Sequence, residues 1–192
     1  MTELLSAGGK TYSELKNLCV WSKTNGGMGS LYRSQHELVF VYKVGTAPHI
    51  NNVKLGRYGR YRTNVWTHPG INSFGENRDD DLALHPTVKP VKLVADAILD
   101  CSNPGGIVLD AFAGSGTTLM AAEKTGRKGY AIELDPQYCD VIVRRIAAAF
   151  KIDAIHGETG KTLEETRLQR ATEGQDNEPP VTAHALKAKK AP

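Results

Sequence analysis

Hydrophobic and polar positions follow a helical period in one part of the chain and a strand-like pattern in others, most clearly between residues 85 and 150. An amphipathic helix is predicted where apolar side chains recur at the spacing i, i+3, i+4, i+7 and i+8: Val91, Val94, Ala95, Ile98 and Leu99. Short apolar runs at 107–109 and 130–132 are typical of buried strands, and helices are expected over 117–124 and 135–150. This alternation of strands and helices predicts an α/β fold with a mostly parallel sheet.

Two further strands are expected upstream, at 17–21 and 37–42, and both are assigned to the same sheet as the later strands. A short helix is expected at the start of the chain, over residues 3–6. At the other end, large apolar residues almost disappear from about Ala171 onward. Such a segment cannot offset the conformational entropy that is lost on ordering, so residues 166–192 are predicted to form a disordered tail.

Composition narrows the class of protein. The chain has 192 residues, of which 40% are hydrophobic and 23% charged, and its net charge is +3, which suits one soluble domain with a tail. No apolar run approaches the roughly 18 residues of a membrane helix, and the N-terminus lacks the pattern of a signal peptide. The cysteines, Cys19, Cys101 and Cys139, form no CxxC pair, which argues against a zinc site or a disulfide framework. We therefore expect a cytoplasmic protein with reduced, mostly buried thiols and no membrane partner.

Charge is distributed unevenly along the chain. The segment 38–75 contains no acidic residue, and its basic residues are Lys43, Lys54, Arg57, Arg60 and Arg62. Aromatic residues are interleaved with these cations, and several glycines favour loops over a packed helix. From charge alone two interpretations stay open: a nucleic-acid surface, or a solvated loop whose cations pair with acids elsewhere.

The stretch that indicates chemistry most strongly is Asp-Ala-Phe-Ala-Gly-Ser-Gly-Thr-Thr at 110–118, where a predicted strand ends and a helix begins. Glycines let the backbone approach a ligand closely, and a helix N-terminus offers free N–H groups to an anionic group. Glu133 follows the next predicted strand, where an acid can accept hydrogen bonds from ribose hydroxyls. The pattern predicts a site for a cofactor that contains adenosine.

Two other cofactor classes fit this sequence less well. A nicotinamide fingerprint needs a third glycine, and that position is Leu119. A phosphate-binding P-loop ending in Gly160-Lys161-Thr162 needs a glycine at position 155, which is Ile155. The P-loop is therefore excluded, and a nicotinamide oxidoreductase is a weak alternative.

Two motifs in fixed order carry a family resemblance. His-Pro-Thr-Val-Lys-Pro at 85–90 and Asp-x-Phe-x-Gly-x-Gly-Thr at 110–117 resemble the tenth and first motifs of DNA amino-methyltransferases that use S-adenosylmethionine. The resemblance covers roughly residues 10–165, and it includes Trp-Ser-Lys at 21–23 and the stretch 29–37. The order is similar to that of a permuted subclass, in which the catalytic half comes first and the cofactor half last. The resemblance implies a Rossmann-like methyltransferase sheet.

The resemblance also implies domains and residue roles. Residues 1–44 would belong to the catalytic half, 45–84 to a target-recognition region and 85–165 to the cofactor-binding half. The expected DNA-binding residues are Lys54, Arg57, Arg60 and Arg62. The expected contacts to S-adenosylmethionine are Thr87, Lys89, Pro90, Asp110, Phe112, Ala113, Gly114, Ser115, Gly116, Thr117 and Glu133, with Glu133 on the ribose. The recognition region overlaps the acid-free segment 38–75, and this overlap favours DNA as the partner.

One motif of the family is missing from these 192 residues. An Asp, Asn or Ser followed by Pro-Pro and an aromatic residue orients the amine of a base that has been flipped from the stack. The sequence Asp-Pro-Gln-Tyr at 135–138 has one proline too few, and Glu-Pro-Pro-Val at 178–181 lacks the polar acceptor and the aromatic residue. We therefore name no catalytic residue. In the permuted order the motif would lie upstream, so the sheet is expected to be incomplete on its N-terminal side.

The sequence thus predicts methyl transfer from S-adenosylmethionine to an exocyclic amine of a DNA base, with adenine N6 favoured over cytosine N4. This chain would carry the cofactor and DNA-recognition parts and would be inactive alone. The alternative is a non-catalytic remnant or split subunit that binds cofactor and DNA and needs a partner chain, either the missing half or a second copy.

Overall fold

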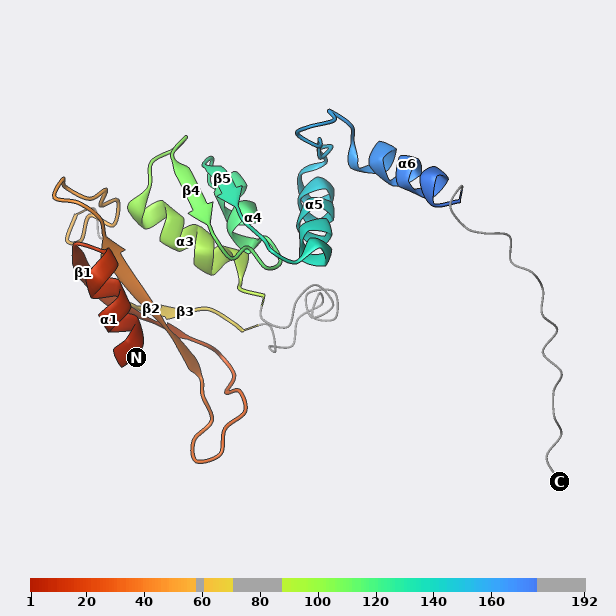
Figure 1. Cartoon of the computed structure of the whole chain (residues 1–192). Coiled ribbons are helices and arrows are strands. Elements are labelled where there is room, and N and C mark those ends of the chain that lie inside the picture. Colours follow the sequence, from red (N-terminus) through yellow and green to blue (C-terminus); the bar gives the residue numbers. More distant parts are fainter. Residues whose placement is uncertain (58–60, 71–87, 176–192) are drawn as a thin grey trace, which may run out of the picture. The chain divides into compact units, whose positions relative to one another are not determined.

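The computed structural model describes residues 1–57, 61–70 and 88–175 (Figure 1). The chain forms two compact units, Met1–Ile146 and Ala147–Pro192. Within the described ranges no helix is both long and apolar enough to cross a membrane, and no group of acidic, His and Cys side chains could hold a metal ion. The domain limits expected from the sequence stay predictions.

A three-stranded sheet occupies the first part of the first unit. Helix α1 (Thr2–Thr11) precedes strands β1 (Glu14–Ser22), β2 (His36–Lys43) and β3 (Val65–Thr67). The strand order is β2-β1-β3, with β1 antiparallel to β2 and parallel to β3. Trp21 is buried in β1, and its indole Nε1 donates a hydrogen bond to the His68 carbonyl oxygen at 3.0 Å. This bond ties the chain beyond β3 to the central strand.

The second part of the first unit alternates helices and strands. Its elements are α3 (Val91–Cys101), β4 (Ile107–Asp110), α4 (Thr117–Lys124), β5 (Lys128–Ala131) and α5 (Pro136–Phe150). Strands β4 and β5 pair in parallel, with Leu109 opposite Tyr130. The predicted helices and the predicted α/β class are confirmed, and the second strand begins two residues earlier than its apolar run suggests.

Small residues allow the helices to pack closely on this sheet. Ala121 and Ala122 of α4 are fully buried and form a core with Ile98 of α3, against which Val108 of β4 packs. Arg127 is also buried after α4, and its Nε and Nη2 donate to the Ser102 hydroxyl at 3.0 Å and the Ser102 carbonyl at 2.7 Å. These bonds join the end of α3 to the start of β5 and satisfy a buried cation.

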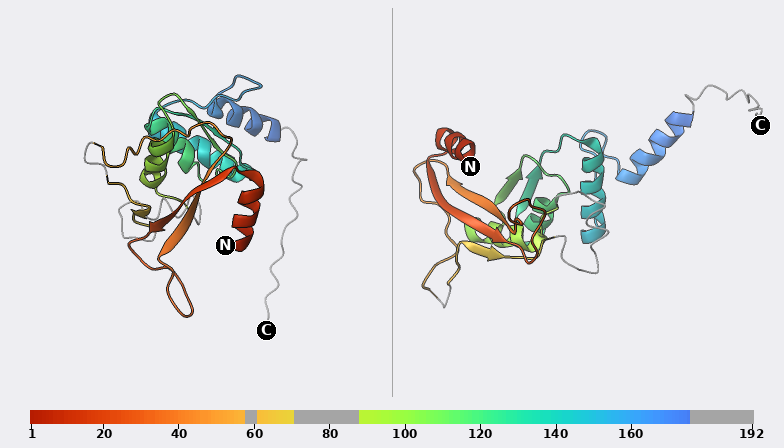
Figure 2. Two further views of the ribbon diagram at one scale, coloured as in Figure 1. Left: turned by 90° about the vertical axis from the view of Figure 1, so that its left-hand side faces the viewer. Right: turned by 90° about the horizontal axis from the view of Figure 1, so that it is seen from below.

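The opposite face of the β4–β5 sheet is exposed. Alternate residues point to the same face of a strand, and here they are large, apolar and between 55% and 68% exposed: Ile107, Leu109, Tyr130 and Ile132. Figure 2 shows the same pair of strands from two further directions. Parallel sheets are normally covered on both faces, so this surface is unusual for a parallel sheet.

One expectation about the sheet is wrong for the described residues. The strands at 17–21 and 37–42 were expected to share a sheet with the later strands, but β1–β3 and β4–β5 form two separate sheets. Neither β4 nor β5 is hydrogen-bonded to the first sheet, and the described residues contain no strand that joins them.

The second unit contains a helix that the composition did not indicate. Helix α6 (Leu163–Gln175) occupies the first ten residues of the expected tail, so the expectation of disorder is wrong for 166–175. The helix begins with a reciprocal cap: Glu165 Oε2 accepts from the Thr162 amide at 2.7 Å, and Thr162 Oγ1 accepts from the Glu165 amide at 3.2 Å. The amide and hydroxyl of Thr162 lower the pKa of Glu165. Residues 176–192 lie outside the described residues.

The cysteines follow the prediction only in part. All three thiols are free, and Cys19 is buried. Cys101, at the end of α3, is exposed, and Cys139 is half-buried. The expectation of mostly buried thiols is therefore wrong for Cys101.

The exposed face of the β4–β5 sheet leads to a prediction about self-association. We expect the chain to associate with itself, because burying this apolar face against a second copy removes it from water. Replacing Leu109 with Lys should lower the fraction of associated species in sedimentation velocity. The control is Leu31→Lys, at an exposed leucine outside both sheets. A wild-type chain that stays monomeric at every concentration would contradict this prediction.

Candidate functional site

The loop between β4 and α4 is closed by the carboxylate of Asp110. Asp110 Oδ1 accepts from the Phe112 amide at 3.0 Å, and Oδ2 accepts from the Thr118 hydroxyl at 2.6 Å. The aspartate at the end of β4 is thereby hydrogen-bonded to the first turn of α4. Its role in this structure is to shape the loop, since both oxygens are used within it.

Two glycines let the loop turn sharply. Gly114 and Gly116 adopt positive φ values of 53° and 78°, a region that other residues rarely occupy. Gly116 also faces helix α5: a Cβ at this position would lie 3.0 Å from Cγ2 of Ile142. The second glycine is therefore needed for both conformation and space.

Glu133 fixes the loop from the neighbouring strand. Its Oε2 accepts from the Gly114 amide at 2.7 Å, and its Oε1 accepts from the Asp135 amide at 3.0 Å. A carboxylate has about four acceptor positions, so each of these oxygens can accept more than one hydrogen bond. Asp135 in turn caps α5, because its Oδ1 accepts from the Gln137 amide at 2.8 Å.

These elements enclose a pocket of about 600 Å³, a volume common for small-molecule sites. It contains eight of the eleven residues expected at the cofactor: Lys89, Asp110, Phe112, Ala113, Gly114, Ser115, Thr117 and Glu133. Pro90 and Gly116 do not line it, and Thr87 lies outside the described residues. The first turn of α4 reaches the pocket through Thr117 and Thr118, where helix N–H groups lack intrahelical partners.

Six further lining residues were not expected: Val88, Val94, Ala111, Thr118, Ile132 and Leu134. Five of them lie within a motif or next to a motif residue, so extending each motif by one position would have included all but Val94. Phe112 and Leu134 are 90% and 96% exposed. Apolar side chains this exposed beside the pocket are suited to cover a flat ring.

Lys89 connects the pocket to the first sheet. Its Nζ lies 3.2 Å from Glu37 Oε2, while Lys23 Nζ lies 2.7 Å from Glu37 Oε1. Both ammonium groups lie over the Trp21 ring, at 5.8 Å and 4.9 Å from its centroid. Burial alone would raise the pKa of Glu37, but the hydrogen bonds and charges of the two lysines outweigh burial and lower it. Glu37 is thus an anion shared by two cations.

The four expected DNA-binding residues differ in their surroundings. Lys54 and Arg57 are exposed, and neither pairs with an acid in the described part of the chain. Arg62 instead forms an ion pair with Asp100 of α3, 2.6 Å from Nε to Oδ2, and lies over the Trp66 ring. Burial raises the pKa of Asp100, although Arg62 favours its charged form. Arg62 is therefore the least available of the described three, and Arg60 lies outside the described residues.

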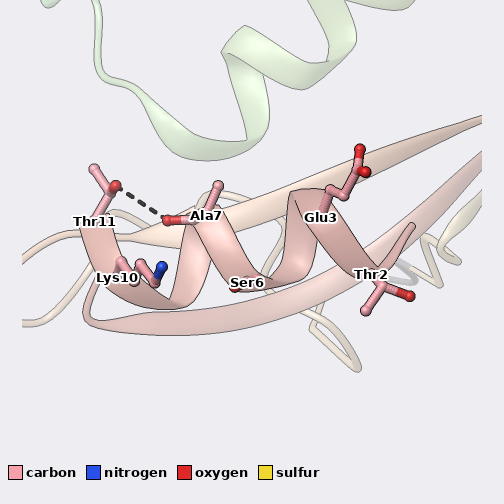
Figure 3. Close-up of a pocket in the computed structure, with 6 residues that line it drawn as sticks. All are labelled: Thr2, Glu3, Ser6, Ala7, Lys10 and Thr11. Carbon is pink, nitrogen blue, oxygen red and sulfur yellow. Dashed lines mark hydrogen bonds between the residues drawn. The ribbon is translucent and has the colours of Figure 1, made fainter.

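Two other hollows are weaker candidates. One lies on the surface of α1 and is bounded only by exposed residues of that helix, as Figure 3 shows. The other, of about 730 Å³, lies between α1, the first sheet and α3, and is mainly apolar and aromatic. Neither gathers acids at the ends of parallel strands, so the pocket at Glu133 is the better candidate.

Comparison with known families gives a match over most of the chain. The profile of the family described as DNA methylase, which covers N6 and N4 methylases, matches residues 9–144. The chain belongs to the DNA methylase family. The match includes the loop at 110–118, Glu133 and Lys89.

Individual methylases show how much is shared. The DNA adenine methyltransferase YhdJ of Escherichia coli K12 is 43% identical over 86 residues, which is 45% of this chain and 28% of the relative. The type II methyltransferase M.ScaI of Streptomyces caespitosus is 34% identical over 96 residues, which is 50% of this chain and 32% of the relative. The chain therefore spans about a third of the length of these methylases.

Solved methylase structures share the fold. The complex of M1.HpyAVI with SAM aligns with a TM-score of 0.59 and 21% identity, covering 76% of this chain and 68% of that one. The cytosine-N4-specific PvuII DNA methyltransferase aligns with a TM-score of 0.59 and 19% identity, covering 92% of this chain and 63% of that one. These likenesses confirm a Rossmann-like methyltransferase fold.

The close approach of Gly116 to Ile142 leads to a prediction about stability. Gly116→Ala should lower the free energy of unfolding by about 2–4 kcal/mol, the sum of backbone strain and overpacking. Gly126→Ala is the matched control, because Gly126 has a φ of 69° but open space around it. Gly126→Ala should lower the free energy of unfolding only by the backbone strain, about 1–2 kcal/mol. Urea unfolding measures both; equal losses would show that Ile142 does not crowd position 116.

Proposed function

We propose that this chain carries the cofactor- and DNA-binding parts of a DNA amino-methyltransferase. S-adenosylmethionine would bind in the pocket at the ends of β4 and β5, and the acceptor would be an exocyclic amine of a DNA base. Adenine N6 is favoured over cytosine N4 by the overall family resemblance. The observation that supports the proposal best is the meeting of Lys89, the loop at 110–118 and Glu133 around one pocket.

The residues present fit this cofactor. The pocket offers two carboxylates and one ammonium group, from Asp110, Glu133 and Lys89. This balance suits a ligand with a positively charged sulfonium, an amino-acid end and sugar hydroxyls. The carboxylate of Glu133 is an acceptor of the kind that ribose hydroxyls need, and the first turn of α4 and Lys89 offer donors to a carboxylate. Phe112 and Leu134 offer apolar surface to a purine ring.

When bound, S-adenosylmethionine supplies an electrophilic methyl group for transfer. The residues of this chain contribute binding and orientation: Glu133 would hold the ribose, and the loop at 110–118 would hold the amino-acid end. Holding the reacting groups in line is the main source of rate enhancement expected here. The chain has no Asp-Pro-Pro-Tyr-like sequence to orient the amine, so we assign no catalytic residue.

A second candidate function follows from that missing motif. The chain would then be a binding module that holds cofactor and DNA but transfers a methyl group only with a partner polypeptide, either a missing methylase half or a second copy. The exposed apolar face of the β4–β5 sheet supports this alternative, because a partner could cover it. Methyl transfer by the purified chain as a monomer would rule the alternative out.

Cofactor binding is tested by replacing Glu133. Glu133→Ala should weaken the binding of S-adenosylmethionine by about 1–3 kcal/mol, because the ribose loses its acceptors. Isothermal titration calorimetry gives the dissociation constant. The control is Glu123→Ala, at an exposed acid on α4 that does not line the pocket. Equal affinity of the Glu133 variant and the wild type would place the cofactor elsewhere.

DNA binding is tested by salt dependence. Replacing both Lys54 and Arg57 with Ala should reduce the slope of log K against log salt by about 0.9 for each phosphate that these side chains neutralise in the wild type. Fluorescence anisotropy with a duplex oligonucleotide measures this slope. Replacing Lys124 and Lys128, two exposed lysines outside the acid-free segment, is the matched control. An unchanged slope in the variant that lacks Lys54 and Arg57 would show that the acid-free segment 38–75 is a solvated loop and not a DNA-binding surface.

A further inference from the structure

Helix α5 contributes a cation that none of the motifs contains. Arg145 does not line the pocket, and its side chain is half-buried behind the loop. Its Nη1 donates to the Ser115 carbonyl at 3.0 Å, to the Ser115 hydroxyl at 3.2 Å and to the Thr117 hydroxyl at 3.3 Å. One nitrogen of α5 therefore serves three acceptors in the part of the loop that faces the pocket.

These contacts reach Lys89, which lines the pocket from outside the loop. Ser115 and Thr117 are buried, and the Thr117 hydroxyl donates to the Lys89 carbonyl at 3.3 Å. A threonine hydroxyl has one proton to give, whereas a guanidinium only donates. Because Arg145 only donates, the Thr117 proton stays available for the Lys89 carbonyl or for the Ser115 hydroxyl, which lies 3.3 Å from Thr117 Oγ1. The result is a chain of hydrogen bonds from α5 through the loop to the segment at 88–90.

The same face of α5 holds the loop at a second point. Ile142 lies three residues before Arg145, the spacing at which helical side chains are neighbours. Its side chain is buried against Gly116, the residue between Ser115 and Thr117. Packing at Ile142 and hydrogen bonding at Arg145 thus act on one three-residue turn. Arg144, the residue before Arg145, is exposed and pairs with Asp140 at 3.2 Å.

We infer that Arg145 is a positioning residue for the cofactor pocket. Its guanidinium holds Ser115 and Thr117 in the geometry that receives the ligand. Through Thr117 it also keeps the loop at 110–118 hydrogen-bonded to Lys89. This inference rests on the proposed binding of S-adenosylmethionine. It adds a residue that touches neither the pocket nor the ligand, and that acts through the two hydroxyls.

The test compares three variants of the full chain by calorimetric titration with S-adenosylmethionine at a temperature where circular dichroism shows each to be folded. Arg145→Met keeps the side-chain stem but removes the donors, and should raise the dissociation constant on the order of tenfold. Arg145→Lys should recover much of the loss, since the contacts to Ser115 and Thr117 come from one nitrogen and an ammonium offers three donors. Arg144→Met should bind like the wild type.

The outcomes separate this inference from the proposed function. A merely structural role would lower the melting temperature of Arg145→Met and leave its affinity, measured on folded protein, unchanged; that result overturns the inference. If the wild-type chain does not bind S-adenosylmethionine, the proposed function fails and the inference fails with it. If Arg145→Met does not fold, Arg145→Gln takes its place with the same expected loss of affinity.

Discussion

The close approach of helix α5 to the loop after β4 is the constraint on which the candidate site depends. Gly116 leaves space for Ile142, at 3.0 Å from where its Cβ would be, and this contact brings α5 near enough for Arg145 to reach the loop. From the other side, Asp110 and Glu133 hold the same loop through its amides. A glycine-rich sequence that would be mobile alone is thereby fixed between a sheet and a helix.

The sequence predicted the elements whose signals are local. Helices α3, α4 and α5 were found because helical periodicity, a proline at the first turn and an aspartate cap are read within a few residues. Strand β3 was missed because three residues carry little pattern and pair only through contact with β1. Helix α6 was missed because its composition is polar, although the capping pair of Thr162 and Glu165 was a usable signal.

The sequence predicted those residues of the candidate site that lie within continuous motifs. Eight of the eleven expected residues line one pocket. Gly116 does not line it, and its role is to leave space for the side chain of Ile142 on α5. Arg145 could not be predicted, since it is separated from Ser115 by 30 residues and lies on an ordinary amphipathic helix. For Arg62 the sequence suggested a role that its surroundings do not favour. Its charge indicated DNA binding, but in the fold it forms an ion pair with Asp100.

The most direct test of the central claim is to locate the cofactor by photolabelling the chain with tritiated S-adenosylmethionine and sequencing the labelled tryptic peptides. If the pocket at the ends of β4 and β5 is the site, the label falls within residues 79–92, 93–124 or 129–144, and unlabelled S-adenosylmethionine removes it while NAD does not. Labelling confined to other peptides, or removed by NAD, would contradict the account.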